Sequence, residues 1–417
     1  MSAILWRAVP VWGLVLALST GPASAQDPRV VTLNQALELS GVAAEADTSP
    51  SNPRLVGPRA ESEAAAALVD QARLRTNPEV SFEVENFAGS GAFSGLQSTE
   101  YTLSVGQRLE LGGKRSARVG AAEAQAELAS LRAELTTVEL GQLVRERYLT
   151  AVAATARVEL AQDVVARNEE LARIAGVLVE VGREPPLRAL RADAALAEAR
   201  AHLVEAEAES LSARTALAAL WAGGEAPLVP AEFPDVLPPA SIMAGATESL
   251  TYRVARAEST AAAAEIVQQR SLRIPDPTVS AGVRRFAESG DNAFLVGVSI
   301  PLPFRDRNQG NVAAAEARLR AANAREAVAL ADYEQAVATA RARYLGAEAR
   351  VETLSRTSLP QAEEALRLVN IGYRNGRFPL IEVLAAAEAR DTIREALIAA
   401  REQRGLAAAE LIGLAAQ

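Results

Sequence analysis

The 417-residue sequence contains no cysteine, one histidine, His202, and one lysine, Lys114. Without cysteine there can be no disulfide, thiolate metal site, thiol nucleophile or lipid anchor on an N-terminal cysteine. A Ser-His-Asp triad would have to use His202, which stands apart from any catalytic constellation. The only lysine lies in Gly112-Gly113-Lys114-Arg115, so the sequence has no Gly-x-x-x-x-Gly-Lys-Ser/Thr nucleotide-binding loop. We therefore expect neither an enzyme nor a motor, and no cofactor.

Ligands for soft metals and basic clusters are also scarce. Outside the N-terminal segment, Met243 is the only methionine, so we expect no metal site beyond weak carboxylate contacts. The net charge is −9, and no basic block resembles a nucleic-acid footprint. Nucleic acid is therefore excluded as an expected partner.

Aromatic residues make up only 4% of the chain, whereas alanine occupies 90 positions. A chain of this length exceeds what one core organises, and it has too few large side chains to fill several cores. Alanine allows helices to approach closely. The composition therefore favours an elongated, mainly helical body.

The N-terminus has the pattern of a signal peptide over residues 1–25. Arg7 precedes an apolar run at 8–18, and the small residues 23–25 predict cleavage before Gln26. A retained anchor is the alternative, but eleven apolar residues do not span a bilayer. No other segment reaches eighteen consecutive apolar residues, so we expect an exported chain without a transmembrane helix.

Most of the remaining chain is a tandem duplication. We assign a first repeat to 26–221, a Pro-rich linker to 222–247 and a second repeat to 248–417. Asn77–Ser81 recurs as Asp276–Ser280 at an offset of 199, and Val119–Ala124 recurs as Val312–Ala317 at an offset of 193. Further matches are Arg145 with Arg341, Arg147 with Arg343, Tyr148 with Tyr344, Leu149 with Leu345, and Gly182 with Gly376.

Each repeat predicts a short helix, a pair of strands, a long helix and a return helix. In the first repeat these span 54–76, about 80–111, 114–181 and 187–221, and in the second they span 250–272, about 278–302, 308–375 and 380–414. At 1.5 Å per residue, each long helix would be a continuous rod of about 100 Å. Glycine followed by proline marks the reversal after each rod, at Gly182 and Gly376.

The strand pairs alternate apolar and polar residues with a period of two, as in Val80, Phe82 and Val84. One interpretation is a half-buried sheet in a soluble exported protein. The other is a contribution to a transmembrane β-barrel, which the aromatic residues in and between these strands favour. Four strands cannot close a barrel, so the second interpretation requires oligomerisation.

The sequence resembles the TolC-type trimeric outer-membrane efflux channels from about residue 32 to residue 414. The stretches Gln107–Arg115 and Ile300–Asn311 resemble the subgroup that serves heavy-metal (cobalt-zinc-cadmium) efflux pumps. The resemblance implies a homotrimer in the outer membrane of a Gram-negative bacterium, with four strands per protomer in a twelve-stranded barrel above a periplasmic helical tunnel. It implies a periplasmic adaptor and a resistance-nodulation-division pump as partners. The barrel-to-helix joints would hold Gly112, Gly113, Pro301, Pro303, Asn308 and Gly310.

The same resemblance points to a periplasmic gate at the tip formed by the two reversals, involving Gly182, Arg188, Tyr373, Gly376 and Glu382. Three copies of Glu382 could form a cation-attracting ring, and Arg188 could pair with Glu382 or Glu184 as a latch. The alternative for Glu382 is an ordinary solvated carboxylate. Ala385 and Phe378 depart from the pattern of better-known members, which puts a double carboxylate ring in doubt.

The predicted function is passive conduction of heavy-metal cations from the periplasm to the exterior. One alternative is a periplasmic coiled-coil adaptor or structural protein. Another is a channel of the same family for drugs or secreted proteins. The duplicated hairpin and the two strand pairs argue against the adaptor.

Overall fold

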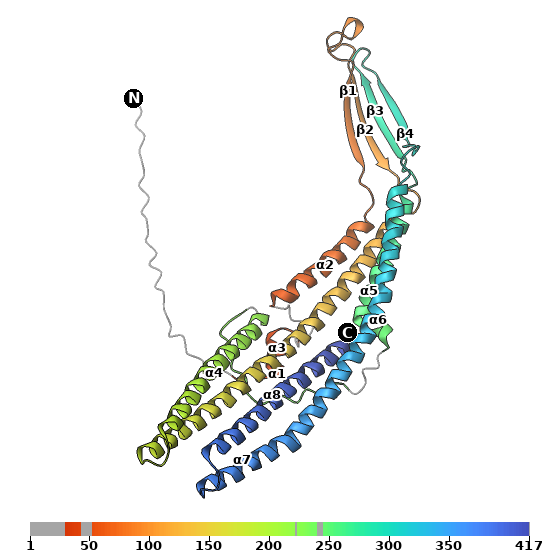
Figure 1. Cartoon of the computed structure of the whole chain (residues 1–417). Helices are drawn as coiled ribbons and strands as arrows, with labels where there is room; N and C mark the ends of the chain where they lie inside the picture. Colours follow the sequence, from red (N-terminus) through yellow and green to blue (C-terminus); the bar gives the residue numbers. More distant parts are fainter. Residues whose placement is uncertain (1–29, 43–51, 222, 240–244, 417) are drawn as a thin grey trace, which may run out of the picture.

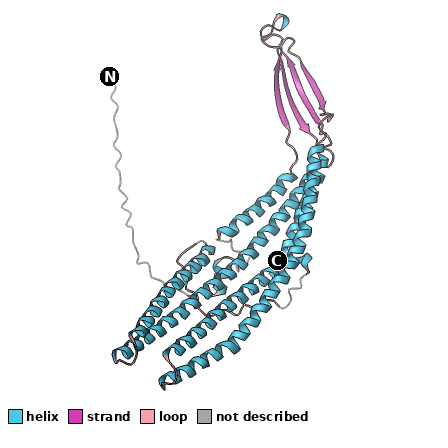
Figure 2. Cartoon of the chain, in the orientation of Figure 1, coloured by secondary structure: helices cyan, strands magenta, loops and turns pink. Residues whose placement is uncertain are grey.

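The computed structural model describes residues 30–42, 52–221, 223–239 and 245–416, so the predicted signal peptide lies outside the described residues. The described chain is mainly α-helical with one small sheet, which confirms the predicted fold class (Figure 2). The sheet lies at one end of an elongated body and two helical hairpins lie at the other (Figure 1).

Both repeats contain the same series of elements, except that the long helix of the second repeat is divided in two. The first consists of α2 (Pro53–Arg73), β1 (Glu79–Glu85), β2 (Glu100–Arg108), α3 (Lys114–Glu180) and α4 (Pro186–Ala218). The second consists of α5 (Leu250–Ser271), β3 (Thr278–Phe286), β4 (Asn292–Ser299), α6 (Gln309–Thr353), α7 (Leu359–Arg374) and α8 (Leu380–Ala416). A short helix, α1 (Leu33–Leu39), precedes the first series, and 3-10 turns occupy Gly91–Phe93, Ala219–Trp221 and Ala246–Glu248.

The four strands form one antiparallel sheet in the order β1-β2-β3-β4. Its central seam joins the two repeats, because β2 pairs with β3 from Glu100 opposite Phe286 to Arg108 opposite Thr278. Strands β1 and β4 pair on one side only and form the two edges of the sheet.

The long helix of the second repeat is interrupted, contrary to the prediction of one rod over 308–375. A π-helical turn at Leu354–Ser358 separates α6 from α7. The prediction took no account of Pro360, which has no N–H for the helical ladder and whose ring clashes with the preceding turn. An extra residue in the turn relieves that clash. In contrast, α3 runs for 67 residues without a break.

The helices pack through small residues and a few large ones. Near the middle of the body, Tyr148 of α3 is buried, and its hydroxyl donates to the Val31 carbonyl at 3.1 Å. Val229, within the predicted linker, joins the same core. A Cβ on Gly405 of α8 would lie 2.9 Å from the Leu149 side chain of α3, so glycine permits this close approach.

Candidate functional site

One face of the sheet is apolar and exposed. Its large side chains are 37% to 91% accessible, and Phe294 is the most exposed of them. A face of this size without a covering layer marks an interaction surface. Its large apolar members are Val80, Phe82, Val84, Tyr101, Leu103, Val105, Val279, Val283, Phe294, Val296 and Val298.

The opposite face is polar. Arg284 of β3 forms ion pairs with Glu85 at 2.9 Å and Glu100 at 2.8 Å, and it donates to the Thr102 hydroxyl. Closer to the helices this face carries small residues, including a hydrogen-bonded pair of Ser81 and Ser104 at 2.7 Å. The sheet therefore has one face suited to lipid or protein and one suited to water.

The first joint connects β2 to α3 through two predicted glycines. Gly112 and Gly113 have φ of 70° and 71°, in the left-handed region that glycine tolerates. A Cβ on Gly112 would lie 2.5 Å from Cδ1 of Ile274, which precedes β3. The joint therefore packs tightly against the second repeat.

An ion pair holds the same joint. Lys114 Nζ lies 2.7 Å from Asp276 Oδ1, and both side chains are largely buried. Burial is the largest single influence on the pKa of Asp276, and it raises the pKa. The hydrogen bonds from Lys114 and from the Leu111 N–H, together with the nearby positive charges, lower the pKa by more than burial raises it. The net effect lowers the pKa of Asp276 below its ordinary value of 3.8. The only lysine of the chain thus links the start of α3 to the start of β3.

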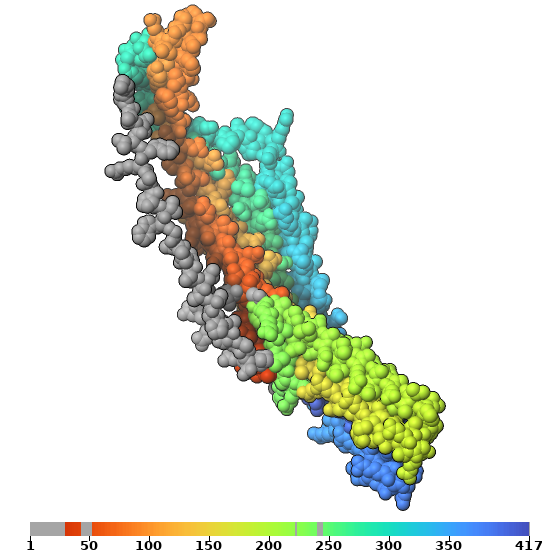
Figure 3. All heavy atoms as spheres, turned by 90° about the vertical axis from the view of Figure 1, so that its left-hand side faces the viewer, coloured from red at the N-terminus to blue at the C-terminus, as the bar shows by residue number. Residues whose placement is uncertain are grey.

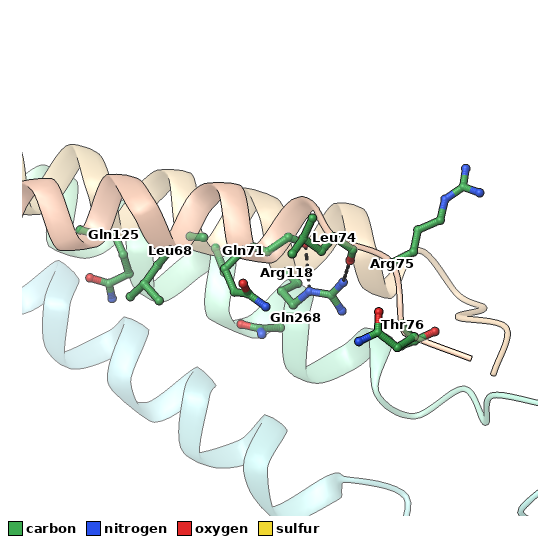
Figure 4. A pocket seen from close by; sticks show the side chains of 13 residues that line it. Leu68, Gln71, Leu74, Arg75, Thr76, Arg118, Gln125 and Gln268 are labelled. Atoms are coloured by element: carbon green, nitrogen blue, oxygen red, sulfur yellow. Dashed lines mark hydrogen bonds between the residues drawn. The ribbon is translucent and has the colours of Figure 1, made fainter. Parts of the chain in front are cut away.

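A second ion pair, Glu110 with Arg118, closes the joint on the side of α2. Arg118 also donates to the carbonyls of Ala72 at 3.1 Å and Leu74 at 3.0 Å, as the close-up shows (Figure 4). The bonded guanidinium lowers the pKa of the Glu110 carboxyl below its ordinary value of 4.5, although burial opposes this. Arg118 lines a groove of about 660 Å³ between α2, α3 and α5, and Arg75 at its edge points away (Figure 4).

The second joint, between β4 and α6, is more exposed to solvent than the first. Pro301 and Pro303 lie in an exposed extended segment, where Phe304 is 78% accessible. Asn308 caps α6 with a φ of 58°, and its amide donates to the Gln269 carbonyl at 2.7 Å. Gly310 lies in the first turn of α6 with nothing within 4 Å of a would-be Cβ.

The tip consists of two matching reversals. At the first, Gly182 has a φ of 71°, and the Arg183 N–H donates to the Leu178 carbonyl at 2.9 Å. At the second, Gly376 has a φ of 68°, and the Arg377 N–H donates to the Gly372 carbonyl at 2.8 Å. These are Schellman motifs, which end a helix on a left-handed glycine. Because each reversal is a Schellman motif, each needs a glycine at the left-handed position, which is Gly182 in the first and Gly376 in the second.

Of the two pairings considered for the latch, the structure contains that of Arg188 with Glu184, at 2.8 Å. Arg188 lies in the first turn of α4 and Glu184 in the reversal just before that helix. Glu382 is exposed in the first turn of α8, and Tyr373 packs against the apolar cluster that joins the hairpins. The tips lie beside each other in the space-filling view (Figure 3), and buried Leu171, Ala192, Leu366, Leu380 and Val383 connect them.

Two features of the lower body escaped sequence reasoning. A Cβ on Gly372 would lie 2.1 Å from the Phe378 ring, so this glycine is required by packing. Between the hairpins runs a ladder of ion pairs from α3 to α8, comprising Arg157 with Glu395 and Glu402, Asp163 with Arg394, and Arg167 with Asp391. The position of Gly372, four residues before Gly376, was a sequence signal that could have indicated its close packing against Phe378. No sequence signal identifies ion pairs between residues more than 200 positions apart.

The described residues contain no group of three or more His, Asp or Glu side chains placed to hold a metal ion. His202 is exposed, with Glu205 at 3.3 Å as its nearest acidic partner. Among the helices of the described ranges, none combines the length and apolarity needed to cross a membrane.

An open sheet with one apolar face, mounted on two long helical hairpins, is the protomer architecture of outer-membrane efflux channels. The sequence matches the outer membrane efflux protein family over residues 48–223 and 247–417. The cobalt-zinc-cadmium resistance protein CzcC of Cupriavidus metallidurans is 33% identical over 367 residues, covering 85% of this chain and 83% of the relative. The nickel-cobalt-cadmium resistance protein NccC of Alcaligenes xylosoxydans is 32% identical, covering 76% of this chain and 71% of the relative.

Solved structures give the same fold. The outer membrane protein VceC of Vibrio cholerae superposes with a TM-score of 0.75 at 21% identity, covering 92% of this chain and 96% of that one. The chain belongs to the outer membrane efflux protein family. It is therefore a transport component of a Gram-negative outer membrane and not an enzyme.

Proposed function

We propose that this protein is the outer-membrane channel of a tripartite resistance-nodulation-division efflux system and that it passively conducts heavy-metal cations. The observation that carries the choice of substrate is the 33% identity to a cobalt-zinc-cadmium resistance protein over 85% of the chain. A periplasmic adaptor and an inner-membrane pump would deliver the cations to the helical end.

The working unit is a homotrimer. Strands β1 and β4 are unpaired sheet edges, and a sheet in a membrane must be closed because no water is present to satisfy its edges. Three copies of the four-stranded sheet would close it, with the apolar face toward lipid and the polar face toward the conduit. The long helices would continue the conduit into the periplasm.

The chemistry of the wall supports passage without tight binding. The described residues hold no multidentate metal cluster, and the polar face carries carboxylates, some already paired with Arg284. Isolated carboxylates bind transition metals weakly. Metal selectivity is therefore assigned to the pump.

The gate is assigned to the tip, with Glu382 facing the axis and the pair of Arg188 and Glu184 bracing the first reversal. The test is single-channel conductance and leakage of drugs and metals for Arg188→Ala and Glu382→Ala. Increased leakage or altered cation conductance is expected. Unchanged conductance and leakage in both variants would remove these residues from the gate.

Deletion of the gene tests the substrate. We expect a lower minimal inhibitory concentration for zinc, cobalt, cadmium or nickel, restored by the intact gene, with drug sensitivity unchanged. Sensitivity to drugs alone would contradict the metal assignment. Recovery of the protein in the soluble periplasm would contradict the channel assignment and favour an adaptor.

Adjacent positions on β4 test the role of the two sheet faces. Phe294→Asp places a charge on the apolar face and should reduce recovery in the outer membrane, because a charge facing lipid is costly. Ala293→Asp, one residue away on the polar face, is the matched control and should be recovered normally. Equal recovery of the two variants would argue against lipid contact.

A further inference from the structure

The two free edges of the sheet are related to its central seam by the internal repeat. Strand β3 corresponds to β1 at an offset of 199, and β2 corresponds to β4 at an offset of 193. The pairing within the sheet supports these offsets. Glu79 lies opposite Gly106 in the first hairpin, and the residues that correspond to them by these offsets, Thr278 and Ser299, lie opposite each other in the second hairpin. The observed β2–β3 seam is therefore a template for a seam between β4 and β1 of another copy.

We propose that β4 of one copy pairs antiparallel with β1 of the next in one defined register, with Val298 opposite Phe82 and Ser299 opposite Ser81. These pairs correspond to Val105 opposite Ala281 and Gly106 opposite Ser280 in the internal seam. The inference rests on the proposed homotrimer and goes beyond it by assigning the residues that meet. The remaining pairs are Ile300 with Val80, Gly297 with Glu83, Val296 with Val84, and Leu295 with Glu85.

The backbone groups of the two edges fit this register. The hydrogen bonds from the Leu109 N–H to the Pro277 carbonyl and from the Ala287 N–H to the Thr99 carbonyl, both 2.9 Å, assign odd-numbered residues of β2 and β3 to the internal seam. Hydrogen-bonding residues alternate along an antiparallel strand. Even-numbered residues of β2 therefore form the hydrogen bonds to β1, and their partners are the odd-numbered residues of β1. The even-numbered residues of β1, such as Phe82, direct N–H and C=O outward.

The same reasoning applies to β4. The Phe286 N–H donates to the Asp291 carbonyl at 3.0 Å, which assigns odd-numbered residues of β4 to its bonds with β3. Even-numbered residues such as Val298 consequently face the free edge. The proposed register places these outward groups opposite those of β1, so every donor in the seam meets an acceptor. Pro301, an odd-numbered residue, removes no donor from this edge.

The side-chain faces agree as well. In the proposed register, Val298 and Val296 of β4 lie beside Phe82 and Val84 on the apolar face. On the polar face, Gly297 lies opposite Glu83 and leaves room for its carboxylate. A shift of one residue would place apolar side chains of one strand against the polar face of the other. A shift of two residues keeps the faces and must be distinguished by experiment.

Pairwise cysteine substitution tests the register directly, because the natural chain has no cysteine. Ser81 and Ser299 would form a pair that is not hydrogen-bonded, where side chains lie closest. The test variant is Ser81→Cys/Ser299→Cys, produced in the outer membrane of a Gram-negative host and oxidised there. Shifted controls are Glu83→Cys/Ser299→Cys and Ser81→Cys/Gly297→Cys, whose partners would be about 7–8 Å apart and beyond disulfide reach.

The internal seam provides a positive control. A Cβ on Gly106 would lie 3.9 Å from Ser280 Cβ, within disulfide range. Gly106→Cys/Ser280→Cys should therefore form a bridge within one chain under the same oxidation. Light scattering in detergent, with reductant, measures whether each variant is a trimer independently of crosslinking.

We expect Ser81→Cys/Ser299→Cys to give covalent dimers and trimers on non-reducing gels, roughly tenfold more than either shifted pair. Either single variant should give neither the trimer band nor a ladder. A shifted pair that crosslinks best, or a trimer with no crosslink while the internal control is oxidised, would overturn the register and leave the trimer intact. A monomer by light scattering would overturn the proposed function itself.

Discussion

The two joints between the sheet and the long helices occupy equivalent places in the two repeats but are held differently. The first contains the buried pair of Lys114 and Asp276 and packs Gly112 against Ile274. The second exposes Phe304, and the Asn308 side-chain amide donates hydrogen bonds to the backbone carbonyl and the side chain of Gln269 in α5. These contacts of the first joint connect the two repeats of one chain. In the proposed register, the second joint would face the first repeat of the next copy, where its apolar residues could be covered.

In the proposed homotrimer, this difference would separate contacts made within one chain from contacts made between copies. The first joint ties β2 and α3 to the second repeat of the same chain. The second joint would leave β4 available to pair with the next copy. Backbone amides in equivalent positions report on the two joints, because Ala117 N–H donates to Gly113 at 2.9 Å and Val312 N–H donates to Asn308 at 3.1 Å.

The largest effect is expected for Gly112→Val. The new side chain must adopt a left-handed backbone conformation and would collide with Ile274, at a cost of about 2–4 kcal/mol. Hydrogen exchange at Ala117 should accelerate strongly. Gly310→Ala at the second joint is the control, and it should leave exchange at Val312 unchanged or slower, since Gly310 has open space around it. Similar acceleration in both variants would contradict the distinction between the joints.

Asp276→Asn should have the next largest effect. The substitution keeps the shape but leaves the Lys114 ammonium, 10% exposed, without its carboxylate. Removing one partner of a largely buried pair should cost about 1–3 kcal/mol here. Thermal unfolding followed by circular dichroism and exchange at Ala117 should both register the loss.

Asp306→Asn is the matched control for that substitution. Asp306 accepts a hydrogen bond from the Asn308 N–H at 2.9 Å at the second joint and is solvent-exposed. Its replacement should change the unfolding temperature less than Asp276→Asn does. A larger change for Asp306→Asn would mean that the second joint also depends on a local charge.

Acid should loosen the first joint selectively. Glu110 and Asp276 have lower pKa values in the folded chain than their ordinary 4.5 and 3.8, so their ionised forms stabilise the fold above those values. This stabilisation is lost as the pH falls below about 4.5 and protonates the carboxyls. Exchange at Ala117, corrected for the intrinsic effect of pH, should rise between pH 5 and 3 relative to exchange at Val312. A parallel rise at both amides would indicate general acid unfolding.

The main elements could be predicted from local pattern. Strand alternation and the Gly-Pro reversals depend on neighbouring residues, and the duplication made each prediction twice. The helix α1 was missed although Thr32 and Gln35 form a capping box, a local signal that was available. The break before Pro360 was likewise local.

Interactions between distant segments could not be predicted in this way. Lys114 and Asp276 are 162 positions apart, and the chain contains 95 charged Asp, Glu, Lys and Arg residues that could supply such a partner. The resemblance placed Gly112 and Gly113 at the joint, but Ile274, which makes Gly112 necessary, lies in the other repeat. The structure supplies the physical reason why we expect substitutions at these positions to be costly.

The smallest effect is expected for Asn308→Gly at the second joint. Glycine keeps the left-handed conformation at the start of α6 and removes the side-chain hydrogen bonds of Asn308, which are two to Gln269 and one from Asn311. The expected loss of stability at this joint is about 0.5–1 kcal/mol, measured as faster exchange at Val312 with exchange at Ala117 unchanged. Asn308→Ala loses the same side-chain hydrogen bonds and also places alanine in a left-handed conformation. It should therefore destabilise the joint by about 1 kcal/mol more than Asn308→Gly does. Equal effects of the two variants would mean that the side-chain hydrogen bonds of Asn308 hold the second joint and that its left-handed backbone conformation contributes nothing.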